Sequence, residues 1–257
     1  MISFFRKIRQ KLLQQNRVTR YLIYALGEIL LVVIGILIAL QVNNWNEERK
    51  QKKQKGILLE SLKTEFEENQ NRLNTLLSFI AQREDYARSL LKLLEGLPSQ
   101  VDSVETVFAL ERAGFVHYFN PTLPTYEEMK SSGTLSLIEN KDLKRRMAEY
   151  QTFLEYSFRI EDGNKEPIQQ YSERILKYMD PDFGDVNITD NESRKYASVK
   201  FDLEAMSNDP EIQYLLKIII QKSVAEAGYK ERIFKPRLTR IIDLIEEEIN
   251  QTADKQG

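Results

Sequence analysis

Residues 21–42 read YLIYALGEILLVVIGILIALQV, and this run decides which architectures are open to the rest of the chain. At 1.5 Å of rise per residue, a helix of this length spans about 33 Å, which matches a bilayer hydrocarbon core of about 30 Å. A core helix of a globular protein is usually shorter and keeps a polar face, whereas residues 29–40 carry no polar side chain. The run therefore predicts a transmembrane helix rather than a buried core helix.

The same run does not have the features of a cleaved signal peptide. It is too long, and residues 37–41 lack the small-x-small pattern of a cleavage site. The chain has no cysteine, which excludes lipoprotein processing, disulfides and thiolate chemistry. We therefore expect an uncleaved signal anchor that crosses the lipid bilayer once.

Flanking charge sets the expected orientation. Residues 1–20 carry six basic side chains and no acid, whereas residues 43–55 carry five basic side chains and two acids. The basic residues of the first flank lie closer to the apolar run, and acids count little in the positive-inside rule. We expect residues 1–20 in the cytoplasm, residues 43–250 as a helical domain outside, and residues 251–257 as a frayed tail.

The basic N-terminal segment has a second property. Residues 3–13 (SFFRKIRQKLL) place apolar side chains at helical spacing, with basic side chains between them. Such an amphipathic helix can lie on an anionic inner leaflet. The alternative is a basic flank that only sets topology, and the sequence does not decide between the two.

Four residues of the apolar run are candidates for a contact between transmembrane helices: Gly27, Glu28, Gly35 and Ala39. Gly35 and Ala39 form a small-xxx-small pair, and Gly27 lies on nearly the same face. A carboxylate inside a membrane is costly and often functional, but Glu28 is near one end of the run and can also reach water. The pattern is compatible with a homodimer, and it is also common by chance.

Composition limits what the body can do. Residues 56–257 carry a net charge of −10, which argues against nucleic-acid binding, because that function needs a basic face. A single histidine argues against histidine-based metal sites and proton relays. Only 10 Gly and 7 Pro, with many Leu, Ile, Glu, Lys and Gln, predict an all-α body.

A heptad rhythm over residues 59–94 is the second clear signal. Apolar residues recur at alternating spacings of three and four, and the rhythm is broken only by Asn69 and Arg83. If Gly56 does not break the helix, it continues directly from the membrane span. Additional apolar residues widen the stripe, which favours packing within one chain over a free coiled coil. We expect an elongated antiparallel bundle of about four long helices.

Shorter signals divide the rest of the body. Thr125 and Glu128 have the spacing of a capping box, and Asn140 is placed to cap a helix that begins at 141. Gly163 and Pro167 are expected to bend or interrupt that helix, and Pro236 to kink the C-terminal helix. The inner faces of these two helices are expected to include Phe158 and Val224, and residues 180–200 to form a loop.

No motif for catalysis, metal binding or cofactor binding is present in convincing form, so we expect neither an enzyme nor a cofactor. The pair Glu67 and Glu68 and the run 246–248 are interpreted as solvated surface charge. The best candidate for a partner or ligand site is the aromatic stretch 115–133, through Phe115, His117, Tyr118, Phe119 and Tyr126. The alternative is that these rings cap the end of the bundle core.

The chain as a whole resembles a family of uncharacterised single-pass bacterial membrane proteins. The resemblance rests on YLIYALGEILLVVIGILIALQVNNWNEERK at 21–50, on the basic FFRKIRQKLL before it, and on PTYEEMKSSGTLSLIEN at 124–140. It implies an anchor in the bacterial inner membrane and an extracytoplasmic helical domain, with no catalytic residues to transfer.

These observations favour a non-enzymatic, membrane-anchored helical module that engages a protein partner in the cell envelope. The alternative is a ligand-sensing bundle. Because only about 20 residues would face the cytoplasm, such a sensor would need a separate effector to pass its signal on.

Overall fold

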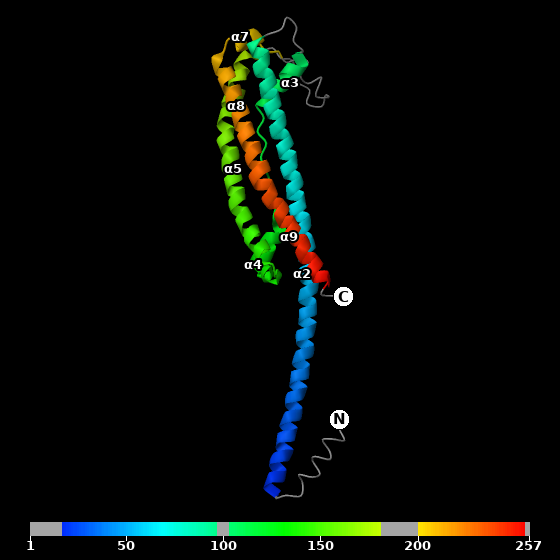
Figure 1. Ribbon diagram of the computed structural model, residues 1–257. Helices are drawn as coiled ribbons and strands as arrows, with labels where there is room; N and C mark the ends of the chain where they lie inside the picture. The colour runs from blue at the N-terminus through cyan, green and yellow to red at the C-terminus, as the bar shows by residue number, and fades with distance from the viewer. Residues whose placement is uncertain (1–16, 97–102, 181–199, 255–257) are drawn as a thin grey trace. The chain divides into compact units, whose positions relative to one another are not determined.

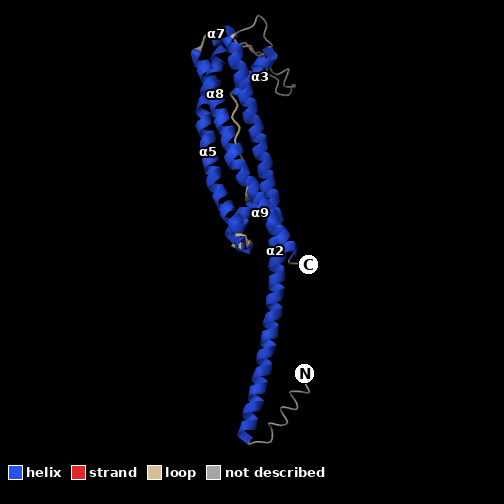
Figure 2. Ribbon diagram, viewed as in Figure 1, coloured by secondary structure: helices blue, strands red, loops and turns tan. Residues whose placement is uncertain are grey.

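The computed structural model describes residues 17–96, 103–180 and 200–254. The segment 3–13 and most of the loop expected at 180–200 lie outside these ranges. The chain divides into two compact units, Met1–Ile57 and Leu58–Gly257. The described residues are helical apart from the connections between helices and one isolated antiparallel bridge between Met179 and Phe201, which confirms the all-α fold (Figure 2).

The first unit contains the apolar run, which lies within helix α2 (Arg17–Glu95). Helix α2 passes through Gly56 without a break. The helix with the heptad rhythm therefore continues directly from the apolar run, as expected for the case in which Gly56 does not interrupt it. Its large apolar side chains from Ile29 to Val42 are 45–74% exposed. Among the described residues, this is the one helix long and apolar enough to cross a membrane.

The second unit is a bundle of three long helical columns (Figure 1). The first column is α2 from residue 58, the second is α5 (Lys141–Ile175), and the third is α8 (Pro210–Tyr229) followed by η3 (Lys230–Phe234) and α9 (Lys235–Asp254). Short helices connect them: α3 (Ser103–Ala113), α4 (Pro124–Ser132), η1 (Thr134–Leu137), η2 (Leu176–Tyr178) and α7 (Leu203–Ser207).

Contacts between the columns fix their directions. Lys63 pairs with Glu246, and Arg83 pairs with Glu226, so α8–α9 runs antiparallel to α2. Phe66 meets Tyr150, and both Leu90 and Tyr171 belong to a second apolar cluster further along the two helices, so α2 and α5 run in the same direction. Two parallel columns in sequence require a connection that returns along the bundle.

That connection is an extended stretch, residues 114–123, which we call the crossing segment (Figure 1). It begins beside Ser172 and passes Glu161 at Phe119. Eleven residues of α5 rise about 16 Å, and five residues of the crossing segment cover that distance at about 3.3 Å each, the rise of extended chain. The bundle therefore has three long helical columns, built from four long helices as expected (α2, α5, α8 and α9), and one extended segment of chain. The expected antiparallel arrangement holds for α8–α9 against α2 but is wrong for α5, which runs parallel to α2 because the crossing segment returns the chain along the bundle.

The heptad prediction for α2 is confirmed in detail. All eleven positions of the rhythm are buried, including the two polar ones: Leu59, Leu62, Phe66, Asn69, Leu73, Leu76, Ile80, Arg83, Ala87, Leu90 and Leu94. Two other predictions of buried side chains are wrong, because Phe158 is 39% exposed and Val224 is 48% exposed. Both lie one position outside the stripe that their helices bury.

The proline predictions have different outcomes. Helix α5 is continuous through Gly163 and Pro167, so the expected interruption is absent. Burial of Asn164 and Ile168 on either side of the proline holds α5 against its neighbours, and this packing outweighs the lost hydrogen bond. In the third column, where a kink is expected at Pro236, the structure has the π-helical turn η3 just before the proline.

Candidate functional site

The crossing segment is held to the bundle by side chains rather than by a neighbouring strand. The Asn69 carboxamide donates to the carbonyl of Thr122 at 2.8 Å and accepts from the N–H of the same residue at 3.0 Å. Glu161 accepts from the N–H of Phe119 at 3.1 Å, and Arg72 donates to the carbonyl of Asn120 at 3.3 Å. Polar groups of an extended backbone need such partners when they are partly buried.

The start of the next helix is capped in the same way. The Thr125 N–H donates to Glu65 Oε2 of α2 at 2.6 Å, and α4 has no side-chain cap of its own. The capping box predicted from Thr125 and Glu128 is therefore wrong. Pro124 already occupies the first helical turn, so Thr125 lies inside the helix and a carboxylate from another helix takes the capping role. Burial raises the pKa of Glu65 above its usual range.

Beside the crossing segment, charged side chains are buried between the columns. Arg83 donates to Glu226 Oε2 at 2.8 Å and to Ser223 Oγ at 3.0 Å. Lys230 donates to Glu161 Oε1 at 2.5 Å and to Ser157 Oγ at 2.7 Å. We call this set the charge layer, and it comprises Arg83, Ser157, Glu161, Asn164, Ser223, Glu226 and Lys230, all of which are at most 3% exposed.

The charge layer divides the core in two. One apolar cluster ends at Ile80 of α2 and Leu154 of α5, and the other begins at Ala87 and Ile168. The layer contains two cations and two anions and is therefore neutral as a whole. Burial raises the pKa of Glu161 despite the opposing charge of Lys230. Glu226 Oε2 also accepts from Asn164 at 2.8 Å, while Glu226 Oε1 accepts no hydrogen bond from the described residues.

Sequence reasoning missed most of this layer, although a signal for it exists. The heptad pattern of α2 indicates Arg83 only as a polar residue that breaks the rhythm. On α5 the same three-and-four spacing continues from apolar residues through Ser157, Glu161 and Asn164. On α8 it continues through Ser223 and Glu226, and reaches Lys230 at the start of η3. Polar residues at core positions of three helices at the same level predict a buried network.

Another buried carboxylate, Glu248, corrects the interpretation of residues 246–248 as surface charge. Glu246 and Glu247 are exposed, but Glu248 is 1% exposed. It accepts from the N–H groups of Glu139 at 2.9 Å and Asn140 at 3.2 Å, just before α5 begins. The predicted cap by Asn140 is confirmed, since its side chain accepts from two N–H groups of the first turn.

The five aromatic candidates separate into two groups. Phe119 and Tyr126 are 3% exposed and belong to the apolar core, where the Phe119 ring packs edge-on against Phe234 with centroids 5.5 Å apart. Phe115 and Tyr118 are 46% and 50% exposed. The crossing segment thus has one core-facing side and one aromatic side that solvent reaches.

His117 links these two sides. Its imidazole stacks on Phe79 of α2 with ring centroids 3.9 Å apart, and it also contacts Phe115 at 4.8 Å. Burial, followed by the charges of Arg83 and Arg112, lowers the pKa of His117 below its ordinary value. The ring is therefore neutral at neutral pH, which suits a stack on another aromatic ring.

The four candidates for a transmembrane contact lie on the exposed surface of α2 in the first unit. Gly27, Glu28, Gly35 and Ala39 are all exposed, and apart from the adjacent residues and the backbone of the same helix no described atom lies within 4 Å of a Cβ placed on either glycine. The contact between two copies of this helix remains a prediction.

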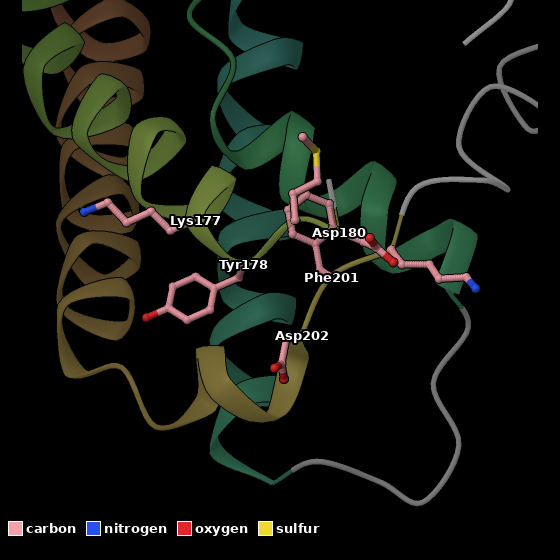
Figure 3. A pocket seen from close by; sticks show the side chains of 7 residues that line it. Lys177, Tyr178, Asp180, Phe201 and Asp202 are labelled. Atoms are coloured by element: carbon pink, nitrogen blue, oxygen red, sulfur yellow. The ribbon is translucent and has the colours of Figure 1, made fainter. Parts of the chain in front are cut away.

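A cavity of about 420 Å³ lies where η2 meets the start of α7, around the Met179–Phe201 bridge. Figure 3 shows Lys177 and Tyr178 extending to one side of it and Asp202 to another. The Tyr178 hydroxyl donates to Asp209, and Arg174 with this hydroxyl holds the pKa of Asp209 at about 2. No group of three metal-ligating side chains occurs among the described residues. The labelled polar side chains around this cavity extend in different directions, so the candidate site remains the aromatic side of the crossing segment.

We call the two hydrogen bonds between the Asn69 side chain and the backbone of Thr122 the Asn69 clamp. Removing this clamp should destabilise the second unit. In Asn69→Leu the N–H and carbonyl of Thr122 lose their partners, and we expect a loss of about 1–3 kcal/mol in the free energy of unfolding. Urea unfolding followed by far-UV circular dichroism measures it. Asn71→Leu on the exposed side of α2 is the matched control, and an equal loss in both variants would show that the clamp is not stabilising.

Comparison with known protein families yields a match over much of the chain. Residues 28–167 match the model of a family of unknown function, DUF6090. No curated protein and no solved structure matches the chain. The matched region begins inside the apolar run and includes the crossing segment and α5 as far as Pro167. Because the match spans more than half of the sequence, this chain belongs to the DUF6090 family of unknown function.

Proposed function

We propose that this chain is a non-enzymatic, membrane-anchored helical module that engages a protein partner in the bacterial cell envelope. Residues 21–42 would cross the inner membrane once, with residues 1–20 in the cytoplasm and the second unit outside. The observation that carries the proposal is an apolar helix surface, exposed all round in the first unit, on the same chain as a folded bundle with exposed aromatics.

The exposed apolar helix supports the anchor. A helix that is apolar on every face needs either a protein core or lipid around it. No described residue buries the most apolar stretch of α2. With about 25 cal/mol for each Å² of apolar surface taken out of water, insertion of such a helix is strongly favourable.

The polar groups of the second unit support a binding role over a catalytic one. The charged side chains of the charge layer are paired with one another, and Glu161 also holds the crossing segment. Catalysis would require a nucleophile, acid or base converging on a space that a substrate can enter. The exposed aromatic side of the crossing segment has the character of an interface instead, because Tyr and Phe are enriched where proteins bind proteins.

We expect the partner to contact the exposed side of the crossing segment. A photoreactive phenylalanine analogue at Tyr118 should form a crosslink to an envelope protein in whole cells. The matched control is the same analogue at Tyr214 of α8, a tyrosine that is 62% exposed in the same unit. Mass spectrometry of the adducts identifies the partner. Equal adducts at both sites, or adducts only with cytosolic proteins, would contradict the proposal.

A further inference from the structure

Four residues just after the apolar run share one face of α2. Trp45, Arg49, Lys52 and Lys53 are spaced i, i+4, i+7 and i+8, which places them along one side of a helix. All four are exposed. Lys50 lies on another side, where its ammonium is 4.0 Å from Glu47. The first unit therefore carries a face with one indole ring and three cations, bordered by the exposed Glu48 at i+3 from Trp45.

The Arg49 side chain shows in which direction these cations lean. Its guanidinium carbon lies 5.8 Å from the centroid of the Trp45 ring, and its Nη2 donates to Asn46 Oδ1 at 3.5 Å. Both partners are one turn nearer the apolar run. Helical side chains tilt toward the N-terminus of their helix, so basic residues that follow a membrane span lean back toward the bilayer.

Depth along the helix agrees with this direction. By helical rise, Trp45 lies about 4.5 Å and Arg49 about 10 Å beyond Val42, the end of the apolar run. The polar region of a bilayer is about 5–8 Å thick on each side. The Arg49 guanidinium, folded back by one turn, falls within it, and the long stems of Lys52 and Lys53 can reach toward it.

We propose that Trp45, Arg49, Lys52 and Lys53 form a binding face for the phosphate groups of anionic phospholipids in the leaflet where α2 leaves the membrane. The inference rests on the proposed anchor. Charge complementarity selects an anionic headgroup, and the indole ring beside the cations selects a lipid over a free anion, because tryptophan favours the boundary between hydrocarbon and headgroups.

Trp45 is the chain's only tryptophan, so its fluorescence reports on this face alone. The full-length protein would be reconstituted in phosphatidylcholine bilayers with increasing phosphatidylglycerol, with bromine on the acyl chains of either lipid. We expect brominated phosphatidylglycerol to quench Trp45 more strongly, with a binding constant relative to phosphatidylcholine of about 3 or more. Lys52→Gln/Lys53→Gln should bring this ratio toward 1, and so should high salt.

The control variant Lys50→Gln/Lys92→Gln removes the same charge from α2 but leaves the face intact, and its ratio should stay near the wild-type value. An equal fall in both double variants would overturn the assignment to this face. Inorganic phosphate that lowers the ratio beyond the effect of equal ionic strength would assign the cations to free phosphate. Quenching by both lipids with a ratio of 1 would overturn the lipid preference and leave the anchor standing. No quenching by either lipid would overturn the anchor as well.

Discussion

Replacing Lys230 by methionine should destabilise the second unit by about 3–5 kcal/mol, the usual cost of leaving one member of a buried ion pair without its partner. Lys230 is fully buried, and its ammonium group donates to Glu161 and to Ser157. Methionine fills a similar volume, so the loss reflects charge rather than a cavity. Urea unfolding of the full chain in detergent, followed by far-UV circular dichroism, measures the change.

The double variant Lys230→Met/Glu161→Gln should recover much of this loss. The glutamine is neutral, and its oxygen can still accept from the N–H of Phe119. Lys63→Met, which removes the cation of an exposed pair with Glu246, should have little effect. If Lys230→Met is no worse than Lys63→Met, or if the double variant recovers nothing, the pairing assigned to the charge layer is wrong.

The loss of stability caused by Lys230→Met should depend on pH in a defined direction. The pKa of Glu161 is raised in the folded state, mainly by burial, from an ordinary value of 4.5. A carboxyl group with a raised pKa contributes stability below that ordinary value and loses the contribution as the pH rises through its folded-state pKa. The deficit of Lys230→Met relative to the wild type should therefore shrink between neutral pH and about pH 5, because protonated Glu161 needs no cation.

A single cysteine should report the orientation of the chain as an all-or-none result. The natural sequence has no cysteine, and Lys217 is an exposed residue of α8. In Lys217→Cys, a membrane-impermeant thiol reagent should label cells whose outer membrane alone has been permeabilised. In Ser3→Cys, the matched control at the other end of the chain, labelling should require lysis of the inner membrane.

The physical reason is the charge around the apolar run. Residues 1–20 carry six basic side chains, the nearest of them directly beside the run at Arg20, whereas the five basic side chains of residues 43–55 begin only at Arg49. The flank with more basic side chains close to the span is the one retained in the cytoplasm. The reverse pattern, with Ser3→Cys labelled first, would place the second unit in the cytoplasm. It would also direct the search for partners there.

Local patterns in the sequence are sufficient for the features that depend on near neighbours along the chain. The apolar run needs only its length and composition to be recognised. The stripe on α2 follows from a spacing of three and four, so all eleven of its positions are buried as expected. The cap by Asn140 is also decided within one turn of helix.

Tertiary structure alone decided which polar groups are buried and what they contact. Glu65, Glu161 and Glu248 accept from N–H groups of residues 42 to 109 positions away, so no local pattern could assign their partners. The parallel course of α2 and α5, and the extended crossing segment between them, likewise depend on distant contacts. Burial of a charge is stable only when its partners arrive from other helices, and their arrival is a property of the fold rather than of any one segment.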